Sequence, residues 1–243
     1  MKQNKYDDNV FFEKYSHMKR SVDGLDAAGE WHELKKRLPN FQGKRVLDLG
    51  CGFGWHCRFA IEHGAQSVIG IDISQKMLHE AEMKTSSECI QYIHMPIEDI
   101  DFTVDSFDVV ISSLAFHYIE SFGDIVHKVS NCLTQGGDFV FSVEHPIFTA
   151  YGTQDWFYDA QGKRQHWPVD RYSYEGKRNA NFLGEEVIKY HRTLTTYVNC
   201  LINEGFEITG LVEPQPPETM LSEPDMMDEL RRPMMLIVSA RKK

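Results

Sequence analysis

The sequence predicts an α/β protein with a doubly wound, mostly parallel sheet and helices on both faces. Short apolar strands alternate with helices between residues 45 and 144, and this rhythm is typical of parallel strands joined by right-handed crossovers. The segment from Phe107 to Ser113 is apolar almost throughout, as expected for a strand that helices cover on both sides. A glycine-rich turn follows the first strand, at the place where such sheets bind ligands.

Beyond residue 40, seven segments have the composition of strands, and four have the spacing of helices. The predicted strands are 46–49, 68–72, 90–94, 107–113, 138–144, 206–212 and 234–240. The predicted helices are 54–63, 74–84, 121–133 and 185–204; Ser74 is a suitable N-cap for the second, and Gly205 ends the last.

The whole chain, 1–243, is expected to form a single domain. Residues 6–38 carry helical apolar spacing, so residues 1–40 are expected to form an N-terminal helical cover, followed by the cofactor-binding core at 41–144. The strand–helix rhythm stops at 145–184, a stretch rich in aromatic residues and turn formers. A long irregular segment inside a compact domain is usually functional, so this insertion could be a lid, with its aromatic side chains forming either a substrate cage or a small core. Residues 185–243 should supply the last helix and strands six and seven.

Composition narrows the possible partners. The formal net charge is −10, and an acidic protein repels phosphate backbones, so we expect no nucleic-acid partner.

The N-terminus lacks an apolar leader, and no run is long enough to span a membrane. The five cysteines contain no CxxC pair, which argues against disulfides or a zinc site and favours a cytoplasmic location. The oligomeric state is left open.

Three glycines follow the first predicted strand, at Gly50, Gly52 and Gly54. Glycine allows a sharp turn and lets a ligand approach the main chain. The third glycine of a dinucleotide fingerprint is missing, because Trp55 follows Gly52 at the required spacing. Asp72 ends the second strand about 20 residues later, where a carboxylate can accept both hydroxyls of a ribose. The pattern favours a nucleoside without a pyrophosphate.

These motifs resemble the class I S-adenosylmethionine-dependent methyltransferases, in particular the type 11 small-molecule group. The resemblance covers about residues 40–145. Val46 to Gly54 looks like the first motif of that family, Gly70 to Ser74 like the second, and Met95 to Asp99 like the adenine-contacting loop. Phe107 to Leu114 and the turn at 133–137 look like the fourth motif and its continuation. Met95 stands where the family most often has an aspartate, which puts one contact to the adenine amino group in doubt.

The resemblance implies strand order 3-2-1-4-5-7-6 with strand seven antiparallel, and S-adenosyl-L-methionine as the cofactor, with S-adenosyl-L-homocysteine as its product. Tyr15 is a further candidate, from the N-terminal cover. The residues expected to contact the cofactor are Tyr15, Asp48, Gly50, Cys51, Gly52, Gly54, Asp72, Ile73, Met77, Ile97, Glu98, Ser112, Ser113 and Leu114.

Methyl transfer by in-line displacement requires mainly alignment and exclusion of water, so no catalytic triad is expected. His117 follows the fourth strand and His145 the fifth, and either could take a proton from the methyl acceptor, which we expect to be a small molecule. Packing roles are the alternative for both. Arg192 could pair with a substrate carboxylate at the start of the last helix, although a solvated helix start is the simpler interpretation.

Two other functions compete with a methyltransferase. A cofactor-binding protein without catalysis would use the same glycines and Asp72. An NAD-dependent oxidoreductase would need the glycine that is missing from the turn.

Overall fold

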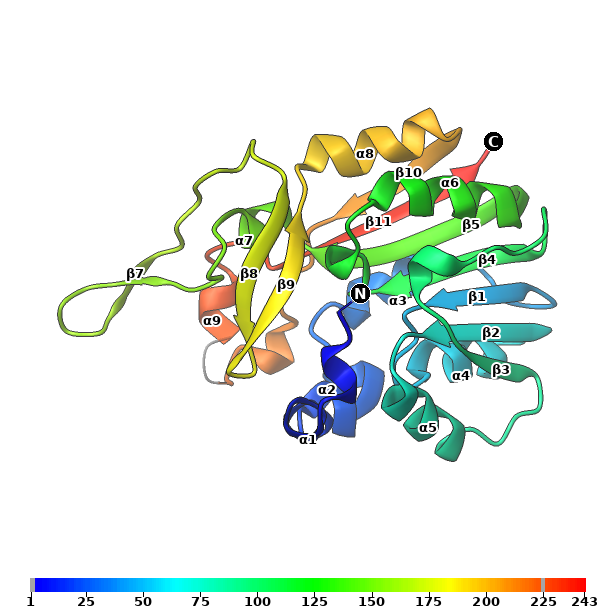
Figure 1. Ribbon diagram of the computed structural model, residues 1–243, viewed down its shortest axis with the longest axis horizontal. Helices are drawn as coiled ribbons and strands as arrows, with labels where there is room; N and C mark the ends of the chain where they lie inside the picture. Colours follow the sequence, from blue (N-terminus) through cyan, green and yellow to red (C-terminus); the bar gives the residue numbers. More distant parts are fainter. Residues whose placement is uncertain (1–2, 224–225) are drawn as a thin grey trace.

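The computed structural model describes residues 3–223 and 226–243. Its centre is a seven-stranded sheet in the order β10-β11-β5-β4-β1-β2-β3 (Figure 1). β11 is antiparallel to both of its neighbours, whereas the pairs from β5 to β3 are parallel. The expected order is therefore confirmed. The strands are β1 (Arg45–Leu49), β2 (Ser67–Asp72), β3 (Ile90–His94), β4 (Phe107–Ser113), β5 (Leu133–Glu144), β10 (Phe206–Val212) and β11 (Met235–Lys242).

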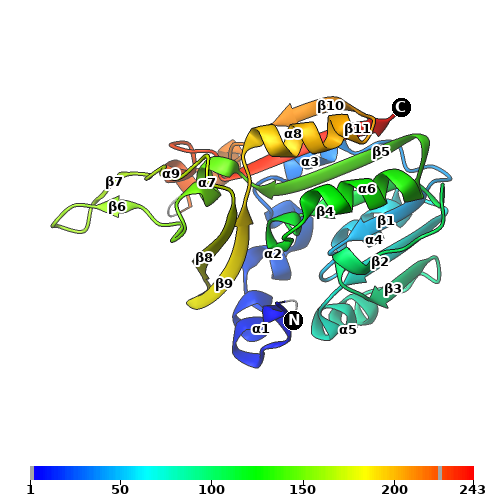
Figure 2. The ribbon, with the colours of Figure 1, turned by 45° about the horizontal axis from the view of Figure 1, so that its top comes forward.

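Helices cover both faces of this sheet (Figure 2). On one face, Leu47, Val110 and Phe139 pack against α6 and α8 in the largest apolar cluster. On the other face, Val46 and Val109 pack against α4 and α5. The helices are α1 (Asn9–Ser16), α2 (Lys19–Val22), α3 (Trp31–Arg37), α4 (Trp55–Glu62), α5 (Gln75–Met83), α6 (Phe122–Cys132), α7 (Pro146–Ala150), α8 (Leu194–Asn203) and α9 (Met226–Glu229). No helix in these described residues is long and apolar enough to cross a membrane.

Side-chain caps fix the starts of several helices. Ser74 accepts a hydrogen bond from the backbone N–H of Met77, as its position predicted. Asp8 caps α1 through the N–H groups of Val10 and Phe11. The N-terminal cover is not one long helix, because α1 ends at Ser16 and α2 spans only one turn before the short 3₁₀ helix Gly24–Ala27. This broken path lets residues 3–30 pass across the carboxyl ends of the strands.

The prediction of one helix over 185–204 was wrong. Residues Glu185–His191 form strand β9, which pairs with β8 (Gly176–Phe182), and only Leu194–Asn203 is helical. Burial alternates along β9, with Val187, Lys189 and His191 inside, so the true period is two rather than 3.6. Gly184, with φ +79°, makes the tight turn between the two strands.

The aromatic insertion is irregular only in part. It contains α7, a two-stranded ribbon of β6 (Phe157–Tyr158) and β7 (Arg164–His166), and β8. The ribbon projects away from the sheet (Figure 1). Phe148 and Trp167 stack at 4.9 Å, Trp156 packs on Trp167, and the Arg232 guanidinium lies 4.4 Å from the centre of the Trp167 ring. The sequence left open whether the aromatic residues form a substrate cage or a small core. Phe148, Trp156 and Trp167 form a small core.

Candidate active site

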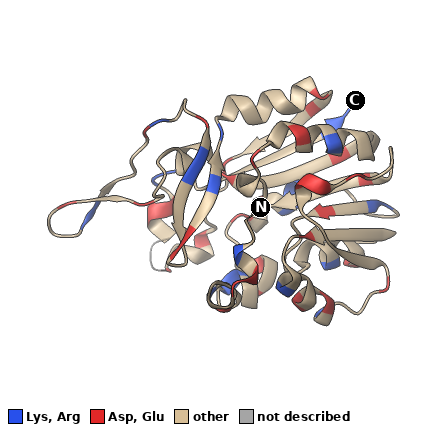
Figure 3. Cartoon of the chain, viewed as in Figure 1, with Lys and Arg blue, Asp and Glu red and all other residues tan. Residues whose placement is uncertain are grey.

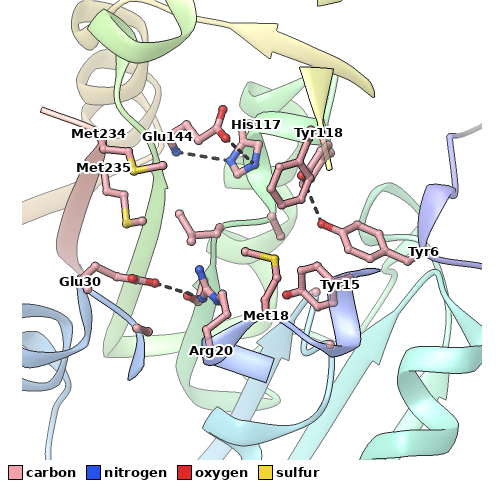
Figure 4. Close-up of a pocket in the computed structure, with 18 of the residues that line it drawn as sticks. Tyr6, Tyr15, Met18, Arg20, Glu30, His117, Tyr118, Glu144, Met234 and Met235 are labelled. Carbon is pink, nitrogen blue, oxygen red and sulfur yellow. Dashed lines mark hydrogen bonds and ion pairs between the residues drawn. The ribbon is translucent and has the colours of Figure 1, made fainter. Parts of the chain in front are cut away.

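A cavity of about 740 Å³ lies at the carboxyl ends of the central strands. Its floor comes from the turns after β1, β2 and β4, and its sides come from residues 3–30 and from the β8–β9 hairpin. Its far wall comes from residues 214–223 and 226–235. Figure 4 shows side chains from these separate segments pointing toward a common space. Parallel sheets bind ligands at this end because the strand order reverses there and leaves a crevice.

The glycine turn has the geometry that its sequence predicted. Gly50, Gly52 and Gly54 all have positive φ, and the N–H groups of Gly50 and Cys51 both donate to the carbonyl of Ile71. A Cβ at Gly52 would meet no atom within 4 Å, so its main chain borders open space. A Cβ at Gly54 would collide with the Tyr92 hydroxyl, so this glycine serves packing. The open main chain at Gly52 is where a ligand can touch the turn.

Asp72 is buried at the end of β2 and lines the cavity. Its Oδ2 accepts the N–H of Gly52 at 2.9 Å, and its Oδ1 accepts the N–H of Ser74. Burial raises the pKa of this carboxyl, and these two backbone donors partly counteract that effect. Carboxylate oxygens have room for further hydrogen bonds, and hydroxyl donors such as those of a ribose suit a partly desolvated acceptor.

Most of the residues predicted to hold the cofactor line one cavity. Cys51 borders a smaller adjoining pocket of about 70 Å³ instead, and Gly54 borders neither. Ser112 is buried and donates to the carbonyl of Leu49, so it supports the floor from below. The predicted residues that line the main cavity are Tyr15, Gly50, Gly52, Asp72, Ile73, Met77, Ile97, Glu98, Ser113 and Leu114.

Asp48 lies beneath the turn, outside the cavity lining. Its Oδ2 accepts a hydrogen bond from the Cys57 thiol, while its Oδ1 has no partner among the described residues. Burial raises the pKa of Asp48 to about 7. Its position under Gly50 and Gly52 suits a support for the turn more than a direct ligand contact.

His117, on the short 3₁₀ helix Phe116–Tyr118, is buried against the end of β5. Its Nδ1 accepts the N–H of Glu144 at 3.4 Å, and its Nε2 lies 4.0 Å from Oε1 of that carboxylate. Burial lowers the pKa of His117 to about 4, although Glu144 acts in the opposite direction. A neutral imidazole that accepts at Nδ1 carries its proton on Nε2.

Glu144 is part of a buried ion pair that the sequence did not reveal. The Lys189 ammonium lies 2.5 Å from its Oε1, and the Gln154 amide donates to its Oε2. Burial opposes ionisation of Glu144, but His117 and Lys189 hold its pKa below the usual value. Lys189 also lies 5.3 Å from the centre of the Phe182 ring. The insertion and the β8–β9 hairpin are thus tied to the sheet at the cavity wall.

His145 and Arg192 do not line the cavity. His145 caps α7, because its Nδ1 accepts the N–H of Ile147, and its Nε2 lies 2.8 Å from Glu213. Arg192 is buried and donates to the carbonyl groups of Phe116 and Glu120, so it is not a solvated helix start and its donors already have partners.

Several lining residues escaped prediction. The hydroxyl groups of Tyr6 and Tyr118 form a hydrogen bond of 3.2 Å, although the two residues are 112 positions apart in the sequence. Neither carries a local pattern that would distinguish it from a core aromatic residue. The far wall of the cavity includes Met220, Met226, Met234 and Met235. In the sequence, the methionine pairs near prolines and acidic residues were the one feature that could have pointed to this wall.

Fold and cavity together define a nucleoside-binding methyl-transfer enzyme: a 3-2-1-4-5-7-6 sheet, an open glycine turn and an aspartate at the end of the second strand. A family model described as a methyltransferase domain matches residues 47–141. The chain belongs to the class I S-adenosylmethionine-dependent methyltransferases, and S-adenosylmethionine is its cofactor.

Solved structures of high similarity support this assignment. A Listeria monocytogenes protein assigned to the S-adenosylmethionine dependent methyltransferases is 57% identical, with a TM-score of 0.87 over 90% of this chain and 99% of that one. An S-adenosylmethionine dependent methyltransferase from Mesorhizobium loti is 45% identical, with a TM-score of 0.84 over 90% of this chain and 100% of that one.

Curated relatives are more diverse. A Haemophilus influenzae protein without a described function is 37% identical over 98% of this chain and 96% of its own. The tRNA U34 carboxymethyltransferase of Hahella chejuensis is 28% identical over 65% of this chain and 45% of its own length.

Proposed function

We propose that this enzyme transfers the methyl group of S-adenosylmethionine to a small-molecule acceptor by in-line displacement. The cavity carries this proposal, because it continues from the glycine turn into a space bordered by Phe182, Val187 and the methionines of the far wall, Met220, Met226, Met234 and Met235. The cofactor supplies an electrophilic methyl group. The protein has to hold the acceptor in line with it and keep water away.

The charges of the cavity favour a small acceptor over a nucleic acid. Among the described lining residues, eight are acidic and three are basic. All three basic residues are already paired with acidic ones, Arg20 with Glu30, Lys19 with Glu223 and Lys5 with Glu185. An acidic mouth repels a polyphosphate backbone. Figure 3 shows acidic and basic residues interspersed along the chain.

A tRNA substrate is the second candidate, because several relatives are tRNA U34 carboxymethyltransferases. The chain spans about half the length of those relatives or less. One assay distinguishes a small-molecule acceptor from a tRNA acceptor. The protein is incubated with methyl-labelled S-adenosylmethionine and either deproteinised small molecules below about 1 kDa or total tRNA. We expect label in the small-molecule fraction only; label in tRNA would overturn the proposal. Gly52→Val, in which the added side chain would occupy the cofactor site, provides the background.

We propose that His117 lies beside the methyl acceptor and donates a hydrogen bond to it. From the sequence alone, His117 was expected to be a base. Its Nδ1 is occupied by the Glu144 N–H, which leaves Nε2–H available as the donor. His117→Gln keeps a donor at a similar reach, whereas His117→Leu removes it. We expect the Gln variant to retain most of the methyl transfer to the acceptor found above and the Leu variant to lose it. Equal loss in both variants would favour a base.

We propose the following roles for the other residues that the sequence analysis singled out. The cofactor is held by Tyr15, Gly50, Gly52, Asp72, Ile73, Met77, Ile97, Glu98, Ser113 and Leu114, which share the cavity. Cys51, from the adjoining pocket, completes that set. Asp48, Gly54 and Ser112 support the turn and the floor. His145 is given no catalytic role, because its imidazole caps α7.

A further inference from the structure

The end of β5 presents an ionised carboxylate to the cavity. Glu144 lines the cavity, and 13% of its side chain is exposed. Among the described residues, Lys189 and Gln154 donate hydrogen bonds to this carboxylate, and neither of them lines the cavity. Both donors therefore reach Glu144 from the surrounding protein. A carboxylate has about four acceptor positions, so positions on the cavity side remain for a ligand that donates a hydrogen bond.

The His117 imidazole places a donor beside this acceptor. Its Nδ1 accepts the N–H of Glu144, while its Nε2 lies 4.0 Å from Oε1 of that residue, too far for a hydrogen bond. Burial lowers the pKa of His117 to about 4, so the ring is neutral and carries its proton on Nε2. His117 follows Leu114, an expected cofactor contact, by three residues, and both line the cavity. The donor and the acceptor therefore lie next to the space for the cofactor.

A hydroxyl group on the methyl acceptor matches this pair. Its hydrogen donates to Glu144, and its oxygen has two lone pairs, so one accepts from His117 while the other attacks the methyl group. A neutral amine has a single lone pair, and a hydrogen bond from His117 would occupy the electrons that the attack requires. An ionised acid has no hydrogen to donate, and its charge would be repelled by the Glu144 carboxylate.

The weakness of the base favours a phenol over other hydroxyl compounds. His117 and Lys189 hold the pKa of Glu144 below its usual value, so this carboxylate is a weak proton acceptor. An aliphatic alcohol is too weak an acid to release its proton to such a base. A phenol is much more acidic, with a pKa of about 10 in the tyrosine side chain. It can give up its proton as the new bond forms.

The cavity wall next to Glu144 is lined by methionines. Met235, on β11, is the direct neighbour of Glu144 on β5. Figure 4 shows Met234 and Met235 on the same side of the cavity as Glu144. Met220 and Met226 extend this wall. Methionine side chains adapt to the shape of a ligand and make favourable contacts with aromatic rings. The wall therefore suits an apolar, aromatic acceptor.

We propose that the acceptor is an apolar phenol and that Glu144 receives its proton; this inference rests on the small-molecule transfer proposed above. The phenol oxygen bonds to the methyl carbon while the bond from that carbon to sulfur breaks, and its electron pair stays on sulfur. The phenol proton moves to Glu144 and from there to water. The products are an aryl methyl ether, S-adenosylhomocysteine and one proton.

The first test measures binding and needs no variant. The protein is saturated with S-adenosylhomocysteine and titrated in a calorimeter with para-butylphenol, para-butylaniline and para-butylbenzoate, which share one apolar body. We expect the phenol to bind at least tenfold more tightly than either of the others. Equal affinities, a preference for the aniline or the benzoate, or no binding of the phenol would overturn the proposal.

The second test removes the carboxylate. Glu144→Gln alone would leave the Lys189 ammonium buried without its anion, so it is combined with Lys189→Met. We expect this double variant to bind S-adenosylhomocysteine within threefold of the wild type and para-butylphenol at least tenfold more weakly. An unchanged preference for the phenol in the folded variant would contradict the role of Glu144. If the variant fails to fold, the titrations of the wild type still decide the proposal.

Arg45→Met combined with Asp108→Asn is the matched control. These residues form an ion pair at 3.1 Å at the opposite end of the strands, and neither lines the cavity. We expect this variant to keep the affinities of the wild type for S-adenosylhomocysteine and the phenol. A loss of phenol binding equal to that of the Glu144 variant would mean that removing any ion pair has this effect, and would overturn the proposal.

The labelled product separates this inference from the proposed function. Small molecules labelled by the wild type are treated with mild alkali and then partitioned against dilute acid. An aryl methyl ether survives alkali and stays in the organic phase, as we expect. A methyl ester releases labelled methanol in alkali, and a methylated amine passes into the acid. Either of these products would overturn the phenol while small-molecule transfer stands. Label in tRNA alone would overturn the proposed function itself, and the phenol with it.

Discussion

The backbone N–H of Gly52 donates to the Asp72 carboxylate at 2.9 Å. This bond joins the glycine turn after β1 to the end of β2, two features that the sequence places 20 residues apart. The same carboxylate also accepts the N–H of Ser74. One side chain thus shapes the turn and offers oxygens to a ligand.

Asp72→Ala is expected to weaken S-adenosylmethionine binding by about 1.5–3 kcal/mol, the usual effect of losing charged hydrogen bonds. Calorimetry measures the change. Because Asp72 also accepts two backbone bonds, part of the loss would come from the turn itself. Asp72→Asn keeps an acceptor oxygen and should lose less. Unchanged affinity in a folded Ala variant would remove Asp72 from the ribose site.

Gly52→Val is expected to abolish cofactor binding while the fold survives. The added side chain would point into open space, where the structure has no atom within 4 Å of a Cβ, so it competes with the ligand rather than with the core. The positive φ of Gly52 adds some strain. Circular dichroism checks the fold and calorimetry the binding. Normal cofactor binding by this variant would mean that the glycines form the turn and do not border the cofactor.

Lys189→Met is expected to destabilise the protein by about 3–5 kcal/mol, because it leaves Glu144 buried without its cation. Urea denaturation measures the loss. Adding Glu144→Gln to the same chain should restore most of it. A double variant as unstable as the single one would mean that Lys189 acts through packing.

The stability of the protein should fall as the pH is lowered from 6.5 toward 4. Burial lowers the pKa of His117 to about 4, while an unfolded histidine keeps its ordinary value of 6.5. The unfolded state therefore takes up a proton first, and the native state loses about 3 kcal/mol across this interval at about 1.4 kcal/mol per unit.

His117→Gln should remove this part of the pH dependence, as seen in urea titrations at pH 7, 5.5 and 4.5. His56 is buried with a pKa of about 3, so part of the slope will persist in the variant. A variant with the full wild-type slope would contradict the assignment to His117.

The cofactor half of the site was predictable because its residues follow strands in a fixed order. Gly50 and Asp72 end neighbouring parallel strands, and such ends always meet at one edge of a sheet. Leu114 and Ile97 are placed by the same rule.

The acceptor half was not predictable, because it is built from segments far apart in the chain. Lys189 reaches Glu144 across 45 positions, and only the β8–β9 pairing brings them together. The sequence from 185 onward was misread as a helix, since Val187 and Ile188 fit either period over so short a run. Trp156, one of the aromatic residues of the insertion, packs on Trp167 and does not line the cavity.

Two segments far apart in the chain border the cavity, residues 3–30 on one side and residues 214–223 with 226–235 on the other. Asp7 accepts hydrogen bonds from the Ser74 hydroxyl at 2.6 Å and from the N–H of Lys76, which fastens residues 3–9 to the start of α5. A ligand that binds between these two segments favours the folded state by mass action, because it binds only where both are in place. The abundance of this enzyme in a cell would then follow the supply of its methyl donor, because proteases act on the unfolded fraction, which a bound ligand lowers.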